Sequence, residues 1–77
     1  MATRKYAYIA AAQARGWHFA DSCMLRGRRP SDLDMKKMLD SAMEYAKDEA
    51  AGSREVFNKK AAISAFRMAF QDHPRVP

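Results

Sequence analysis

The sequence predicts an all-α protein, organised as a small three-helix domain. In three segments the apolar residues recur at the spacing of a helix face. A helix-start signal, proline followed by serine and two aspartates, precedes the second segment, while Gly52 and Pro74 follow the second and third. The predicted helices cover residues 3–25, 32–51 and 54–71.

The chain is short for a globular protein. Its 77 residues make one helical domain, residues 1–77, with residues 72–77 expected to form a flexible tail. A chain of this length buries only about 60% of its unfolded surface, so a homodimer or a protein partner is expected to complete the thin core. We expect the core to centre on Trp17, Leu39, Ile63 and Phe66.

The first predicted helix has Thr3 as its cap and Gly16 as its weak point. A glycine inside a helix costs about 1 kcal/mol relative to alanine, and it can instead end one short helix before Trp17 starts another. The apolar stripe keeps its phase across Gly16, which favours a continuous helix. This stripe, expected to face the second helix, consists of Tyr6, Ile9, Gln13, Trp17, Ala20 and Met24.

The second predicted helix begins at Asp32, with Ser31 as its cap and Asp34 in a capping-box position. Its charged residues lie opposite an apolar stripe, and Gly52 is expected to end it in the left-handed conformation. The stripe consists of Met35, Met38, Leu39, Ala42 and Ala46.

The third predicted helix is capped by Ser53, has Glu55 in its first turn and runs to Gln71. It is apolar on two sides, so either both sides pack internally or one of them is an interface. The first side holds Val56, Ile63, Phe66 and Phe70. The second side, our candidate protein-binding face, holds Phe57, Ala61, Ala65 and Met68.

Basic residues concentrate between the first two predicted helices. The net charge is +5 and the densest positive segment lies within residues 26–37. It either binds phosphates, binds an acidic protein surface or is simply solvated. The candidate anion-binding residues are Arg26, Arg28, Arg29, Lys36 and Lys37, together with Arg4 and Arg15.

Arg4, Arg15 and Arg26 recur every eleven residues, with Tyr8 and Phe19 at the same spacing beside them. Such an edge can hold phosphates while its rings stack on bases. In the alternative, which we favour, the two aromatic rings belong to the core and the arginines lie over them.

The sequence lacks the residue patterns of an enzyme or a metal site. His18, Asp21 and Cys23 are close in sequence but do not share one helix face, and His73 is far from them along the chain, so we expect no catalytic set, metal or cofactor. A small-molecule substrate is not expected either. With a single cysteine and no apolar segment long enough to span a bilayer, the expected location is the cytoplasm, away from membranes.

Two classes of function therefore compete. The favoured class is a non-enzymatic protein-binding module, an inhibitor or adaptor that blocks or bridges sites on a larger complex, by analogy with small phage or mobile-element proteins. A nucleic-acid-handling complex is one such target. The alternative is a nucleic-acid-binding protein that uses the arginines of residues 26–29 and the arginine/aromatic edge. This alternative lacks a recognisable motif for reading base sequence, because residues 50–53 do not fit the turn of a helix-turn-helix motif.

Overall fold

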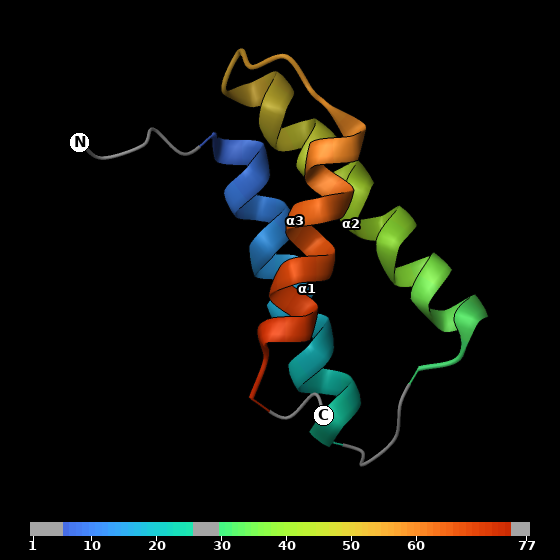
Figure 1. Cartoon of the computed structure of the whole chain (residues 1–77). Coiled ribbons are helices and arrows are strands. Elements are labelled where there is room, and N and C mark those ends of the chain that lie inside the picture. Colours follow the sequence, from blue (N-terminus) through green and yellow to red (C-terminus); the bar gives the residue numbers. More distant parts are fainter. Residues whose placement is uncertain (1–5, 26–29, 75–77) are drawn as a thin grey trace.

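The computed structural model describes residues 6–25 and 30–74, and in this part of the chain it is entirely helices and their connections. The all-α prediction is confirmed. The helices are α1 (Ala7–Leu25), α2 (Asp32–Gly52) and α3 (Lys59–Asp72), shown in Figure 1. α2 begins where the sequence predicted, whereas α1 and α3 begin later than expected.

The three helices form a flat arrangement of 38 × 29 × 17 Å. α1 and α3 run side by side in the same direction, and α2 runs in the opposite direction (Figure 1). α3 packs mainly on α1 and touches α2 least. α2 therefore covers one side of the α1–α3 pair and leaves the other side without a covering helix in the described part of the chain.

Gly16 lies at the closest approach of α1 and α3. The helix continues through this residue. Of the two alternatives, a continuous helix and a break at Gly16, the continuous helix is correct. A Cβ atom added at Gly16 would lie 2.3 Å from the carbonyl oxygen of Phe66 and 3.2 Å from Cβ of Ala69. Only glycine lets the two backbones come this close.

The core consists mostly of alanines, with Phe66 as its one fully buried large side chain and Tyr8, Met43 and Phe70 also buried. Phe66 is fully buried, and its ring lies 6.1 Å from that of Phe19 and 6.4 Å from that of Phe70. Small core residues allow the helices to pack closely, which increases dispersion contacts between their backbones. The alanines with no exposed surface are Ala12, Ala20, Ala42, Ala46 and Ala62.

The predicted centre is correct for Phe66 and wrong for Trp17. Leu39 and Ile63 are partly buried against the core, but Trp17 is 47% exposed. The predicted stripe is also wrong at Tyr6, which is 54% exposed. The reason is that α1 turns Gly16 toward α3, which carries Trp17 outward. Tyr6 precedes α1, and its ring stacks on that of Tyr8 at 5.9 Å. The residues that α1 buries are Tyr8, Ala11, Ala12, Gly16 and Ala20.

The N-terminus of α1 is capped by a residue that is distant in the sequence. Glu55 accepts hydrogen bonds from the backbone N–H groups of Ala7, at 2.9 Å, and Tyr8, at 3.2 Å. A carboxylate suits this position because the helix N-terminus carries a partial positive charge and unpaired N–H groups. Glu55 was expected in the first turn of the third helix, and that prediction is wrong. The predicted cap Thr3 lies outside the described residues.

The ends of α2 and α3 are capped locally. The Ser31 hydroxyl accepts a hydrogen bond from the N–H of Asp34 at 3.1 Å, which confirms the predicted cap. Gly52 remains helical, and the left-handed residue is Arg54, with φ of 56°. The predictions of a left-handed Gly52 and of a Ser53 cap for α3 are therefore wrong. Asn58 caps α3 instead, accepting from the N–H of Ala61 at 3.1 Å.

The C-terminal end of α3 returns to α1 through His73. This side chain is only 4% exposed, its Nε2 lies 3.3 Å from Oδ1 of Asp21, and its ring centroid lies 4.6 Å from that of Trp17. The predicted flexible tail begins at Asp72, which is the last residue of α3. His73 follows it and packs against α1.

The Gly16 contact predicts opposite effects for two glycine substitutions. Gly16→Ala should destabilise the domain by about 1–3 kcal/mol, because the added methyl group forces α1 away from Phe66. Gly52→Ala, the matched control, adds a methyl group with no atom within 4 Å and should be neutral or stabilising by up to about 1 kcal/mol. Urea unfolding of both variants measures the difference, and equal effects would contradict the proposed role of Gly16.

The Glu55 cap predicts a second loss of stability. Glu55→Ala removes the acceptor for two N–H groups and should lower the free energy of unfolding by about 0.5–2 kcal/mol. Glu44→Ala is the control, because Glu44 is exposed on α2 and its loss should change stability by less than about 0.5 kcal/mol. Urea titrations followed by circular dichroism compare the two. If Glu55→Ala were as mild as its control, the cap would not contribute.

Candidate functional site

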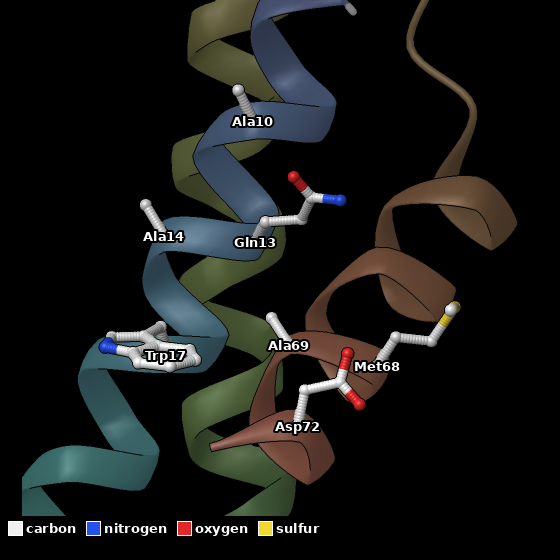
Figure 2. Close-up of a pocket in the computed structure, with 7 residues that line it drawn as sticks. All are labelled: Ala10, Gln13, Ala14, Trp17, Met68, Ala69 and Asp72. Carbon is white, nitrogen blue, oxygen red and sulfur yellow. The ribbon is translucent and has the colours of Figure 1, made fainter. Parts of the chain in front are cut away.

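A shallow groove lies between α1 and α3, on the side away from α2. Figure 2 shows α1 and α3 in front with α2 passing behind them. The groove has a volume of about 460 Å³ and is open to solvent rather than enclosed. The residues that line it are Ala10, Gln13, Ala14, Trp17, Met68, Ala69 and Asp72.

The close helix contact at Gly16 creates this groove. It holds Ala69 of α3 against α1, so the floor is formed by small side chains. Trp17 stands on the α1 side and Met68 on the α3 side, and they are 47% and 60% exposed. The groove is thus a small-residue floor between two large apolar side chains.

The groove belongs to a wider surface that we call the outer face. On this surface α1 contributes no charged side chain between Ala10 and Trp17, because the guanidinium of Arg15 lies 4.2 Å from the centroid of the Tyr45 ring on α2. A contiguous exposed apolar surface of this kind is typical of an interaction site. The outer face consists of Ala10, Ala14, Trp17, Met68 and Ala69, with Gln13 and Asp72 beside them in the groove.

Other exposed apolar residues do not form a comparable surface. Leu33, 62% exposed, lies between two aspartates in the first turn of α2, and Val56, 90% exposed, follows Arg54 and Glu55 in the connection to α3. Isolated exposed apolar residues are normal in small proteins. The outer face is distinguished by its continuity and by the lack of a charged side chain from α1.

The residues of the predicted protein-binding face do not lie together on one exposed surface. Phe57 precedes α3 and is half buried, with its ring 5.5 Å from that of Tyr8. Ala65 is buried and Ala61 is half buried. Met68 alone among the four is on the outer face. The helical spacing assumed for Phe57 does not apply, since α3 begins only at Lys59.

The structure describes part of the predicted anion-binding set. Lys36 and Lys37 are exposed on the first turns of α2. Arg15 contacts α2 at Tyr45, about two turns further along the helix, so it does not join them. Arg4, Arg26, Arg28 and Arg29 lie outside the described residues.

The two aromatic residues of the predicted arginine/aromatic edge belong to the core, as the favoured alternative held. Tyr8 is 5% exposed, and Phe19 is partly buried with its ring against Phe66. The Tyr8 ring is therefore withdrawn from stacking on a base, and the Phe19 ring is engaged with the core. Arg15 lies over Tyr45, rather than over Tyr8 or Phe19.

Sequence reasoning missed the contact of His73 with Asp21 and Trp17, because these residues are far apart in the chain. The other candidates for chemistry remain separate. His18 is exposed, with its ring 5.8 Å from that of Phe19, and Sγ of Cys23 lies 3.8 Å from Sδ of Met38. Within residues 6–25 and 30–74, no three His, Cys, Asp or Glu side chains are arranged to hold a metal ion.

Sequence reasoning also missed the outer face, although a signal for it was present. Within residues 7–25 the only Lys, Arg, Asp or Glu residues are Arg15 and Asp21. Most sides of this helix therefore carry no charge. A helix that is apolar or uncharged all round has to be covered on more than one side. Periodicity alone pointed to a single stripe and so concealed this second surface.

The chain matches no protein-family model, no curated protein and no solved structure. Among the described helices, none is both long and apolar enough to cross a membrane. A function therefore has to be argued from the surface itself, since the fold class alone does not imply one.

Proposed function

We propose that this protein is a non-enzymatic protein-binding module, and that the outer face is its binding surface. The observation that carries the proposal is the uncharged face of α1 from Ala10 to Trp17, continued by Met68 on α3. In this chain 30% of the residues are charged. An exposed apolar surface without a charged residue at its centre is typical of a surface that another molecule covers. In the cell the module acts as an inhibitor or adaptor on a larger complex.

The chemistry of the outer face suits a protein partner. Trp17 and Met68 are of the residue types enriched at interface centres, and covering them removes apolar surface from water. The small side chains of Ala10 and Ala14 let the backbone of a partner helix approach closely. A small ligand is less suited, because ligand sites usually enclose most of the ligand surface whereas this groove is open.

The flat shape of the domain supports the same proposal. Its smallest dimension is 17 Å, and α2 covers only one side of the α1–α3 pair. A partner on the outer face would bury the second side and extend the thin core. Added apolar burial stabilises a small domain at about 25 cal/mol per Å² of surface removed from water.

The buried His73 is assigned a packing role in this proposal. A histidine beside an aspartate resembles part of a catalytic set, but His73 is 4% exposed and its ring lies against Trp17. A general base must reach the substrate within hydrogen-bonding distance. The contact instead ties the end of α3 to α1 beneath the outer face.

The nucleic-acid alternative has less support. Tyr8 and Phe19 are engaged in the core and Arg15 lies over Tyr45, so the stacking surface on which it drew is occupied. Its remaining support is the net charge of +5 and the arginines of residues 26–29.

A lysine placed in the outer face tests the proposal. Ala14→Lys should leave the domain helical, because Ala14 is exposed, but it should reduce protein association at least about tenfold by burying an unpaired charge in the interface. Ala51→Lys, on an exposed position of α2, carries the same charge and should bind as the wild type does. Nuclease-treated lysate is passed over each immobilised variant, and captured proteins are quantified by mass spectrometry. Full retention of every partner by a folded Ala14→Lys variant would refute the proposal.

Reversal of the arginine charges within residues 26–29 separates the two classes of function. If the proposal holds, changing Arg26, Arg28 and Arg29 to Glu should leave association through the outer face within about threefold of the wild type, and the wild type should bind nonspecific DNA or RNA only weakly. Fluorescence anisotropy over a salt series provides the measurement. Tight nucleic-acid binding that falls steeply with salt and disappears on reversal would favour the alternative.

A further inference from the structure

We propose that the partner segment bound on the outer face is an amphipathic helix that places an arginine side chain between Trp17 of α1 and Asp72 of α3. This inference rests on the proposed function and names the chemistry of its partner. A helix lying in an apolar groove is a recurring mode of peptide recognition, in which a few side chains at helical spacing act as anchors.

Trp17 and Asp72 border the same end of the groove. Both line it, and they come from different helices (Figure 2). His73, the residue after Asp72, has its ring centroid 4.6 Å from that of Trp17, which places the end of α3 level with this ring. Ala69, about one turn before Asp72, forms the floor beside them. An aromatic ring and a carboxylate are therefore both available to one ligand group.

The Asp72 carboxylate favours a cation at this end of the groove. Asp72 is exposed, and among the described residues no cationic side chain forms an ion pair with it. It is also the last residue of α3, and the last turn of α3 contains no basic residue. A helix C-terminus carries a partial negative charge. A cation supplied by the partner would therefore interact favourably with the carboxylate and with the helix end.

The Trp17 ring favours the same ligand, and arginine in particular. The side chain is 47% exposed although His73 lies against it. A cation over the face of a tryptophan is attracted by the ring quadrupole. The planar guanidinium of arginine can stack on a ring and also donate two parallel hydrogen bonds to a carboxylate, whereas the lysine ammonium is a point charge. The apolar stem of the arginine can lie over Ala69 and Met68.

The rest of the groove suits the body of the same helix. From Ala10 to Trp17 the α1 side of the groove extends about 10 Å, or two helical turns. Apolar side chains of the partner, one and two turns away from its arginine, would lie over Ala14 and Ala10. The small side chains there allow the two backbones to approach closely.

The net charge of the chain makes this preference diagnostic. At +5, nonspecific attraction draws acidic partners to the chain. A partner that presents a cation to Asp72 opposes this general attraction. A preference for arginine therefore has to come from the local arrangement of the groove.

Selection from a displayed peptide library tests the preference. The library consists of amphipathic helices of about four turns with randomised positions beside a fixed apolar stripe. Peptides that bind the wild type but not Ala14→Lys are kept, and among them arginine should be enriched at least about fivefold at one position relative to the unselected library. Selection against Asp72→Lys should instead enrich Asp or Glu at that position. Asp48→Lys, on an exposed position of α2, is the matched control and should give the wild-type preference.

Two results of the selection would overturn the inference. One is a set of groove-binding peptides without a basic preference. The other is a selection that yields no groove-binding peptide.

Replacement of the arginine by citrulline in a selected peptide isolates the contact with Asp72, because citrulline keeps the shape and removes the charge. The replacement should raise Kd at least about tenfold with the wild type and less than about threefold with Asp72→Asn. Trp17 is the only tryptophan of the chain, so its fluorescence reports binding at the site, and circular dichroism confirms that the variant is folded. An equal effect of citrulline on both proteins would refute the pairing with Asp72.

The remaining outcomes separate this inference from the proposed function and from other occupants. If Ala14→Lys abolished capture of proteins from lysate while the selected peptides had no basic preference, the proposed function would stand without the arginine. If Ala14→Lys retained every partner and no peptide were sensitive to it, both would fail. A wild-type dimer that Ala14→Lys dissociates would make a second copy the occupant. Peptide binding only after Arg75→Gln would make the chain's own C-terminus the occupant, and either result would overturn the inference.

Discussion

The close approach of α1 and α3 at Gly16 is the contact on which the rest of the structure depends. The backbone of α1 lies directly against the Phe66 carbonyl, in a space that a methyl group would overfill. Around it the core is built from alanines, so backbones rather than long side chains provide much of the packing. A core of this kind needs few large residues, which suits a chain of 77 residues, but it tolerates little added volume.

This contact also determines which residues face solvent. With Gly16 turned toward α3, the adjacent side of α1 carries Trp17 outward, where it lines the groove. α2 packs behind the pair and takes up Arg15 through the Tyr45 ring, which removes the nearest cation from the outer face. The groove, and the absence of charge on its α1 side, therefore follow from how the core is packed, and the proposed function depends on both features.

Contacts between residues distant in sequence hold both ends of α1. Glu55, from the connection between α2 and α3, accepts hydrogen bonds from the first N–H groups of α1. At the other end His73 lies between α1 residues Trp17 and Asp21. These contacts keep α1 in register with α3 along its length, so the outer face is supported by a rigid element rather than by a loop.

The sequence by itself determined the helical class, the start of α2 and the burial of Phe66. Those features depend on neighbours within a few residues: the Ser31 cap reaches Asp34, and helical spacing identifies apolar residues that share a side. Local periodicity cannot specify which of several apolar sides of a helix faces the core. That choice, which placed Trp17 outside and Tyr8 inside, was decided in the tertiary structure by the fit of Gly16 against Phe66. The role of Glu55 was also decided there, because its partners Ala7 and Tyr8 become its neighbours only when the helices pack. Phe57 does not follow the helical spacing of α3, because α3 starts at the Asn58 cap. The outer face follows from these long-range fits, because a surface becomes exposed only once the competing surfaces of the same helix have found partners.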